Sequence, residues 1–310
     1  MSALPISARL LLSYLLVAVL PLAGLAAFYL VSFESSLRET VLENIATIAD
    51  KKAEQIDSYI AERLADTRLL SQRDSVLDGM TTLMPLFRTG GLKTPAYQSA
   101  ARQLNDYLMA SSAVEDFYDL LLIDTAGNVV FSLKQEPDLG TNLMQGPYRH
   151  TQLAKGYALA MQTLQTHLSR FALYPPSGNQ PAAFLVAPVL DKGVVIGALA
   201  LQLDIKKLES VTADRTGLGR TGETLLAQQD GDDAYYTAPL RHVPQAAYRY
   251  RVPRDATLAM HKALAGDHGR GINIDYAGIE GVAAWHYLPA LGWGMVVKID
   301  TSEALAPAAQ

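Results

Sequence analysis

The feature that most constrains this chain is Leu10–Phe33, a run of 24 residues without a charged side chain. At about 1.5 Å per residue, a helix of this length spans roughly 36 Å and can cross a hydrocarbon core of ~30 Å. A cleaved signal sequence would have a shorter apolar core that ends at small residues. This run instead continues through Phe28 and Tyr29 into another helical pattern. We therefore predict a cytoplasmic stub and a retained transmembrane helix in residues 1–33.

Charge next to this run predicts its orientation. Arg9 and the amino terminus precede it and Glu34 follows it, which favours a cytoplasmic N-terminus and an extracytoplasmic body. The chain has no cysteine, which excludes disulfides and thiolate metal sites. Its net charge is −5 and its basic residues are scattered, so nucleic acid is not expected as a partner. The remaining length suits two domains.

Residues 34–73 contain neither proline nor glycine and carry apolar residues at steps of three and four. The apolar positions are Leu37, Val41, Ile45, Ile48, Ala53, Ile56, Ile60 and Leu64. This pattern predicts a helix of roughly 60 Å that packs against the body, a second copy or both. The stripe permits a parallel homodimer. The helix is either a stalk or a strut that transmits motion to the membrane.

Asp78-Gly79, Pro85 and Thr89–Gly91 are expected to interrupt the helical pattern, and a further helix is predicted around 97–108. From residue 118 the apolar period becomes that of strands. The predicted strands are 118–123, 129–133, 182–189, 194–204, 224–228, 234–237, 248–252, 270–275, 282–287 and 293–299. Helices are predicted at 153–164, 206–214 and 256–264. Similar segments recur in the same order in both halves, which indicates a structural duplication.

Several segments together resemble the double Cache sensor domain of bacterial transmembrane receptors. They are Tyr118–Asp124, Phe184–Pro188, Gly193–Ile205, Leu218–Glu223 and Trp293 through Lys298-Ile299-Asp300 to Glu303-Ala304. The resemblance implies an α+β fold in which a transmembrane helix runs into a long helix, followed by two PAS-like modules with antiparallel sheets. The expected boundaries are 34–73 for the signalling helix, 74–205 for the membrane-distal module, 206–300 for the membrane-proximal module and 301–310 for an exit segment.

The same resemblance implies a function. It predicts the extracytoplasmic sensor region of a receptor in a bacterial inner membrane, with a small organic ligand in the membrane-distal module. The expected output is a histidine kinase; a chemoreceptor or a diguanylate cyclase is the alternative. Because the chain ends at Gln310 without a second apolar run, we expect a fragment that is not itself an enzyme. A membrane-tethered hydrolase and a scaffold with vestigial pockets are further alternatives.

The sequence departs from the amino-acid-sensing subgroup at two places. Where that subgroup has an Arg-x-Trp-Tyr element, this chain has Gly146–His150 without tryptophan. Where it has an aspartate after the third strand, this chain has Tyr174–Ser177. These departures predict that an amino acid is not recognised in that subgroup's mode.

Motifs for cofactors and metals are weak. Gly217–Gly222 fits G-x-G-x-x-G, but a helix precedes it and a strand follows, the reverse of a dinucleotide-binding fold. The six histidines lack zinc spacing, and Asp230, Asp232 and Asp233 lack the alternation of a calcium loop. No nucleophile lies in a Gly-x-Ser-x-Gly context. We therefore predict no cofactor, no metal and no catalytic residue.

Aromatic and basic residues gather in the segment 118–184, as in a concave small-ligand pocket. The candidate ligand-binding residues are Tyr118, Lys134, Tyr148, Arg149, Tyr157, Arg170, Phe171, Tyr174 and Phe184. Arg149 or Arg170 could clamp a carboxylate, so the expected ligand includes carboxylate-bearing molecules. The alternative is that the aromatic residues are ordinary core and the arginines ordinary surface.

Overall fold

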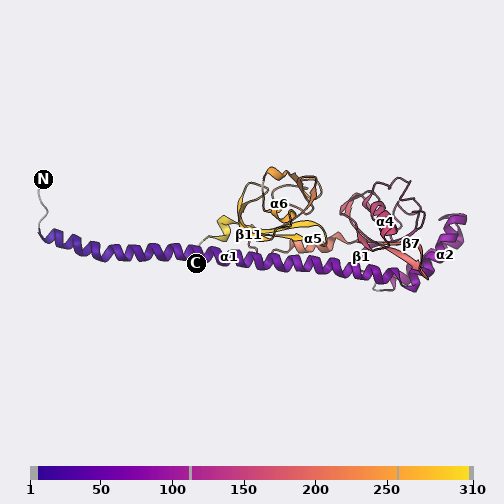
Figure 1. The fold of residues 1–310 in the computed structure, drawn as a ribbon, viewed down its shortest axis with the longest axis horizontal. Coiled ribbons are helices and arrows are strands. Elements are labelled where there is room, and N and C mark those ends of the chain that lie inside the picture. The colour runs from indigo at the N-terminus through magenta and orange to yellow at the C-terminus, as the bar shows by residue number, and fades with distance from the viewer. Residues whose placement is uncertain (1–5, 112–113, 257, 307–310) are drawn as a thin grey trace.

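The computed structural model describes residues 6–111, 114–256 and 258–306. One helix, α1 (Ile6–Ser71), runs the length of the molecule, and two α/β modules lie along its second half (Figure 1). We call residues 74–205 the distal module and residues 206–300 the proximal module, by their distance from the uncharged part of α1. The predicted fold class is confirmed: an apolar helix continues into a long helix that carries two antiparallel sheets.

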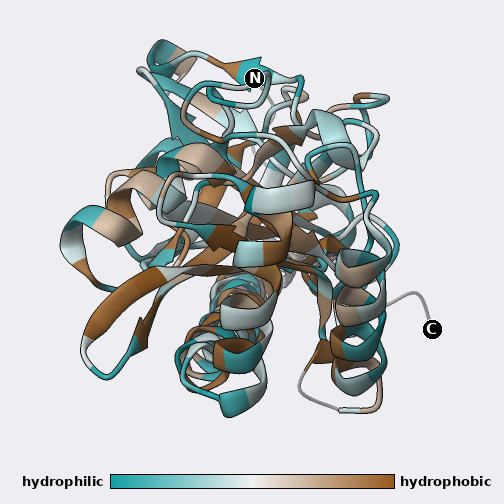
Figure 2. Cartoon of the chain, turned by 90° about the vertical axis from the view of Figure 1, so that its right-hand side faces the viewer, coloured by the Kyte–Doolittle hydropathy of each residue, from teal (hydrophilic) through white to brown (hydrophobic). Residues whose placement is uncertain are grey.

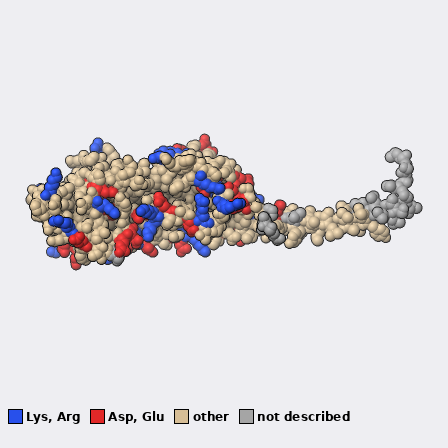
Figure 3. Space-filling model, turned by 180° about the vertical axis from the view of Figure 1, so that it is seen from behind, with Lys and Arg blue, Asp and Glu red and all other residues tan. Residues whose placement is uncertain are grey.

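The uncharged part of α1 projects away from both modules. Its described apolar side chains are exposed, among them Tyr14 at 73%, Leu20 at 62% and Phe33 at 53%. Its most apolar window has a mean hydropathy of 1.8, and it is the one helix among the described residues that is long and apolar enough to span a membrane. Charged side chains of both signs cover the body, whereas the projecting segment shows none (Figure 3). Such a surface is unfavourable in water and favourable in hydrocarbon.

The second half of α1 is held by one buried face. Ile45, Ala49 and Ile56 are at most 1% exposed, and the helix packs on strands of both modules. Lys52, also buried, donates hydrogen bonds to the carbonyls of Val211 (2.5 Å) and Asp214 (2.8 Å). The helix is therefore a shared wall for the two modules and not a free stalk in this region.

Two helices extend the distal end, α2 (Asp74–Gly90) and α3 (Pro95–Met109). The expectation that Gly79 and Pro85 interrupt a helix was wrong, since α2 runs through both. A Cβ at Gly79 would lie 2.8 Å from Leu104, so glycine lets α3 pack closely here. Pro85 cannot bond the carbonyl of Thr81, but Thr81 is exposed and water can satisfy that group.

The distal module contains a five-stranded antiparallel sheet in the order β2-β1-β7-β6-β3. Its elements are β1 (Phe117–Asp124), β2 (Val129–Ser132), α4 (Gln152–Thr163), β3 (His167–Leu168), β6 (Phe184–Asp191) and β7 (Val194–Leu203). A small separate sheet pairs β4 (Ala172–Tyr174) with β5 (Gln180–Ala182), across the short helix η2 (Pro175–Ser177). One face of the main sheet packs on α1 and α2, and α4 covers the other.

The proximal module repeats this plan in a six-stranded sheet, β10-β9-β8-β13-β12-β11. Its elements are α5 (Ile205–Ala213), β8 (Glu223–Asp230), β9 (Asp233–Tyr236), β10 (Arg251–Val252), η3 (Arg254–Ala256), α6 (Ala259–Leu264), β11 (Gly269–Ile274), β12 (Glu280–Leu288), β13 (Trp293–Asp300) and α7 (Thr301–Ala304). The order 9-8-13-12-11 matches the distal order 2-1-7-6-3, so the similar segments of the two halves occupy equivalent strands. Seen along α1, apolar strands lie between more polar loops and helices (Figure 2).

The two ends of the body meet beside α1. Leu305, just after α7, lines the same surface hollow as Val31 and Glu34 of α1. The described chain therefore returns to the point on α1 where the uncharged segment ends (Figure 1).

Candidate functional site

The distal module has a sheet face built from small residues beneath α4. Ala198 and Ala200 of β7 lie fully buried on this face. Tyr157 from α4, Tyr174 from β4 and Phe184 from β6 fill the space above them. The rings of Tyr174 and Phe184 meet edge to face at 4.8 Å, and the Tyr157 hydroxyl donates to the carbonyl of Asp124 at 2.8 Å. The face is thus closed by the chain's own aromatic side chains.

Buried acids border this aromatic layer. Asp119, 1% exposed, accepts hydrogen bonds from the Ser132 hydroxyl (2.8 Å) and the Lys134 amide (2.9 Å). Asp138, also 1% exposed, accepts a 2.6 Å bond from the Tyr174 hydroxyl through Oδ2. Its Oδ1 has no hydrogen-bond partner among the described residues. A buried carboxylate oxygen without a donor is costly, so this atom is a place where a ligand donor would be favourable.

The environment raises the pKa of both carboxyl groups. Burial raises the pKa of Asp119 to about 7, although bonds from Lys134 and Ser132 lower it. Burial likewise raises the pKa of Asp138, against the bond from Tyr174. Glu136 stands near them and accepts bonds from Tyr118 (2.8 Å) and Ser177 (2.6 Å). The edge of the distal face therefore carries three carboxyl groups held by neutral donors.

The predicted ligand-binding residues fall into three groups. Tyr157, Tyr174 and Phe184 lie together on the distal face. Tyr118 and Lys134 lie beside it, with the Lys134 ammonium 5.3 Å from the Tyr118 ring centre. The third group lies elsewhere and consists of Tyr148, Arg149, Arg170 and Phe171.

The third group is at the surface or between the modules. Arg149 is exposed and bonds only weakly to its neighbour's carbonyl at Gly146 (3.3 Å), and Tyr148 is half-buried beside it. Arg170 donates to the carbonyl of Gln229 in the proximal module at 2.5 Å. Phe171 packs against Trp293 with ring centres 5.1 Å apart. The two arginines therefore do not meet in one carboxylate clamp.

Three buried polar residues were missed: Asp119, Asp138 and Gln202, whose amide contacts Ser177 at 3.2 Å. Asp119 and Gln202 interrupt strands that are otherwise mostly apolar. A polar residue at a position that faces a covering helix could have marked them in the sequence. Asp138 lies in a loop, where no periodicity marks burial.

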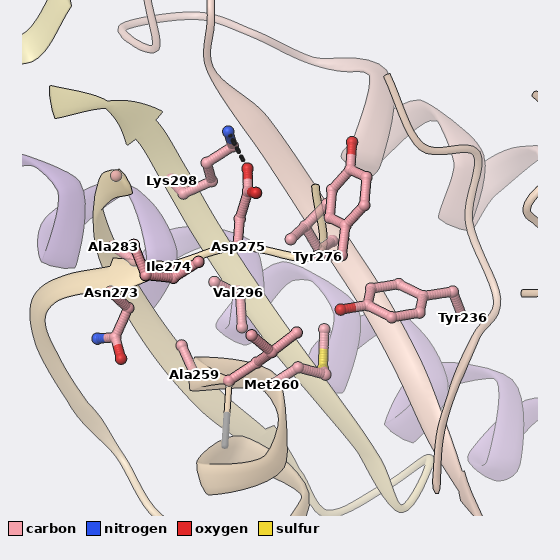
Figure 4. A pocket seen from close by; sticks show the side chains of 13 residues that line it. Tyr236, Ala259, Met260, Asn273, Ile274, Asp275, Tyr276, Ala283, Val296 and Lys298 are labelled. Carbon is pink, nitrogen blue, oxygen red and sulfur yellow. Dashed lines mark hydrogen bonds and ion pairs between the residues drawn. The ribbon is translucent and has the colours of Figure 1, made fainter. Parts of the chain in front are cut away.

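The proximal module contains a cavity on the equivalent side of its sheet (Figure 4). The cavity is small, about 20 Å³, which is room for about one water molecule. Ala259 and Met260 of α6 lie at one end and the Lys298–Asp275 pair at the other, with Tyr236 and Tyr276 along one side (Figure 4). The lining is apolar except at the charged end, which is a common form for a small-molecule cavity.

The charged end is a compact ion network. The Lys298 ammonium, 1% exposed, lies 2.6 Å from both Asp275 Oδ2 and Asp300 Oδ1. Glu223 is 3.8 Å away and accepts bonds from the Tyr276 hydroxyl. Burial lowers the pKa of Lys298, but the bonds to Asp275 and Asp300 outweigh burial and raise it. Lys298 is therefore a fixed cation.

The glycine motif and the acidic turn are both satisfied within the chain. Glu303 of α7 accepts the amides of Arg220 (2.9 Å) and Thr221 (2.7 Å), the groups that a phosphate would otherwise use. These bonds lower the pKa of Glu303 to about 2. In the acidic turn, Asp230 forms a 2.7 Å ion pair with Arg251.

Two PAS-like modules with one strand order, arranged along a single helix that ends in an apolar segment, define a class of sensor domain. The family model for the Cache domain matches residues 33–308. The chain belongs to the double Cache family, whose members are extracytoplasmic ligand-binding sensors of membrane receptors.

Solved structures agree in fold. The sensor domain of the V. cholerae histidine kinase DctB has a TM-score of 0.56 and 15% identity, over 85% of this chain and 98% of that one. The ligand-binding domain of the Campylobacter jejuni chemoreceptor Tlp3 with L-norvaline has a TM-score of 0.57 and 14% identity, over 89% of this chain and 96% of that one. The ligand-binding domain of the Pseudomonas aeruginosa amino acid chemoreceptor PctB with L-Arg has a TM-score of 0.53 and 14% identity, over 87% of this chain and 100% of that one. No curated protein sequence matches the chain.

Proposed function

We propose that this chain is the sensor region of a bacterial inner-membrane receptor, crosses the membrane once through its uncharged helix, and binds a small organic ligand in the distal module. The observation that carries the proposal is the distal face itself: small residues under an aromatic layer, edged by buried carboxyl groups. The output is a histidine kinase in this proposal, with a chemoreceptor or diguanylate cyclase as the alternative. The chain itself catalyses no reaction.

The bound state requires the aromatic layer to open. Tyr157, Tyr174 and Phe184 now occupy the space over Ala198 and Ala200, so a ligand of several atoms must displace at least one ring. Glu136 is held by one hydroxyl from each side, Tyr118 and Ser177. Breaking these bonds would remove two of the contacts that hold the loop after β2. A ligand then shifts the equilibrium by its preference for the open form.

The acids favour a ligand that donates hydrogen bonds. Asp138 Oδ1 offers an unpartnered acceptor, and Asp119 and Glu136 lie nearby. An amine or hydroxyl group fits this edge better than a carboxylate does. A carboxylate elsewhere on the same ligand could still reach Lys134. The relatives Tlp3 and PctB carry amino acids, which combine both groups.

The proximal cavity is the second candidate position. Its apolar lining supports an apolar ligand group there, but its volume of about 20 Å³ holds about one water molecule, so a ligand would have to widen it. Its charged end is already neutralised within the chain, so a ligand would gain less from new polar contacts than at Asp138.

A thermal-unfolding screen of the full chain in detergent micelles tests the proposal. The panel should contain amines, amino acids and carboxylic acids. A ligand at 100 times its Kd adds about 2.7 kcal/mol to the free energy of unfolding. Asp138→Asn should weaken a distal ligand roughly tenfold or more, because a charge-assisted bond is worth about 1.5–3 kcal/mol. Asp106→Asn, an exposed aspartate of α3, is the matched control.

A second variant separates the two positions. Ala259→Leu extends a side chain into the proximal cavity and should leave a distal ligand unaffected. The reverse result, binding lost in Ala259→Leu and kept in Asp138→Asn, would move the ligand to the proximal module. A panel without any stabilising compound would argue against small-molecule sensing, and turnover of a panel compound would revive the hydrolase.

A further inference from the structure

Where α1 passes the proximal sheet, three potential metal ligands converge. Asp50 comes from α1, His286 from β12 and His268 from the loop before β11. The histidine spacing in the sequence predicted no metal site, because these residues belong to separate segments. The fold brings them together.

The distances suit coordination of one ion. The Nε2 atoms of His286 and His268 lie 2.9 Å and 3.8 Å from the same Asp50 oxygen. One ligand atom from each residue can be chosen so that all lie within 4.8 Å of one another. The two imidazole rings are 4.0 Å apart and tilted by 35°. Neighbouring ligands of a tetrahedral zinc ion, with bonds of about 2.0–2.1 Å, are roughly 3.3 Å apart, so small side-chain rotations suffice.

One ring nitrogen in this group lacks a hydrogen bond. The His286 side chain is 11% exposed, and its Nε2 has no hydrogen-bond partner among the described residues. Its nearest polar neighbour is the Asp50 oxygen at 2.9 Å, which can pair with it only when this ring nitrogen carries a proton. A buried polar atom of this kind needs a partner, and a metal ion would supply one.

The surroundings leave room for an ion. The Asp50 and His268 side chains are 57% and 65% exposed, so an ion can enter and water can complete its coordination. The next acids on α1 toward its N-terminus, Glu43 and Glu39, are engaged by Arg270 at 3.8 Å and 2.6 Å. They therefore compete little for a cation at Asp50.

We propose that Asp50, His268 and His286 bind a divalent first-row transition metal such as Zn²⁺. Imidazole nitrogens are ligands that such metals prefer and that Mg²⁺ and Ca²⁺ do not, and a carboxylate oxygen is also a zinc ligand. The ion would join α1 to β12 and to the loop before β11. Metal occupancy would therefore restrain the long helix against the proximal sheet, whichever organic ligand the chain binds.

Titration of the metal-stripped full chain in detergent micelles with Co²⁺, followed by visible absorption, tests this site. We expect about one Co²⁺ per chain, displaced by Zn²⁺ and not by Mg²⁺ or Ca²⁺. Losing one of three protein ligands in His268→Ala should weaken binding by roughly 100-fold or more. His150→Ala, which removes an exposed histidine of the distal module, should bind as the wild type does.

His268 is the better test residue because it is exposed and its loss should not unfold the chain; Asp50→Asn gives a second exposed variant. Hydrogen exchange in the edge strand β11 should slow with Zn²⁺ in the wild type and not in His268→Ala. Absence of Co²⁺ and Zn²⁺ binding would overturn the proposal. Binding that survives in both His268→Ala and Asp50→Asn would also overturn it, since the ion would then sit elsewhere.

Discussion

The two modules share one strand order but hold some of their buried charged groups in different ways. In the proximal module the buried Lys298 ammonium lies 2.6 Å from both Asp275 and Asp300. In the distal module Asp119 and Asp138 are as deeply buried, and no ion pair among the described residues includes either of them. Neutral donors hold these two acids instead.

This difference predicts that the proximal interior resists rearrangement more strongly than the distal interior does. An ion network is costly to disturb, because removing one partner leaves the others buried and unpaired. Carboxyl groups held by hydroxyls and amides can change protonation or exchange a donor at lower cost. We therefore expect the distal interior to be more easily changed by pH or by a ligand than the proximal interior.

The largest expected effect is that of Lys298→Met. It should lower the free energy of unfolding of the proximal module by about 3–5 kcal/mol, because Asp275, Asp300 and Glu223 would lose their cation. Both tryptophans of the chain, Trp285 and Trp293, lie in this module. Urea unfolding followed by tryptophan fluorescence therefore reports on the proximal module.

Lys155→Met is the control, since it removes an exposed lysine from α4 in the distal module. It should change the tryptophan-detected transition by less than about 0.5 kcal/mol. A loss below about 1 kcal/mol in Lys298→Met would mean that the acids relax or take up protons. The contrast between the modules would then fail.

The sequence predicted correctly those elements that depend on residues close together in the chain. The β1–β2 hairpin was predicted from Asp124–Asn128, and Asp124 indeed accepts the amides of Ala126 and Asn128 across the turn. α2 was missed because the packing of Gly79 under Leu104, a tertiary contact, decides whether a helix passes there. β3 and β4 have two and three residues, too few to show a period.

The second largest effect concerns pH and Asp119. Burial raises the pKa of Asp119 to about 7 from an ordinary value near 4, so the folded chain holds this proton more tightly than the unfolded chain does. Its contribution to stability is complete below about pH 4, falls as pH rises and is lost above about pH 7. For one group this corresponds to roughly 4 kcal/mol across that range.

Asp119→Asn removes the titrating group. The free energy of unfolding of the wild type, relative to Asp119→Asn, should therefore decrease between pH 4 and pH 7, measured by urea unfolding with far-UV circular dichroism. Asp106→Asn serves as the exposed control. A constant difference between wild type and Asp119→Asn over this range would mean that Asp119 stays ionised and that the distal interior is not adjustable by pH.

The candidate distal site was only partly predictable, because tertiary contacts decide which side chains of an irregular segment lie together. The clustering of aromatic residues in one segment singled out Tyr157, Tyr174 and Phe184, which lie together on the distal face, and their role in ligand binding stays a prediction. Arg170 and Phe171 belong to the same segment, but they lie where the chain turns toward the proximal module. No periodicity in an irregular segment tells which module a side chain faces.

The smallest expected effect tests that junction. The sequence predicted that Arg149 or Arg170 clamps a carboxylate; of the two, only Arg170 reaches across to the proximal module, at the Gln229 carbonyl. Arg170→Ala should lower the free energy of unfolding by about 1 kcal/mol, the value of one hydrogen bond, and should separate the tryptophan-detected transition from that seen by circular dichroism. Arg149→Ala, which removes the same group without a contact between modules, should leave the two transitions together. If instead Arg170→Ala weakens a ligand from the screen and the transitions stay coincident, Arg170 acts in recognition and the modules are coupled mainly through Phe171, Trp293 and α1.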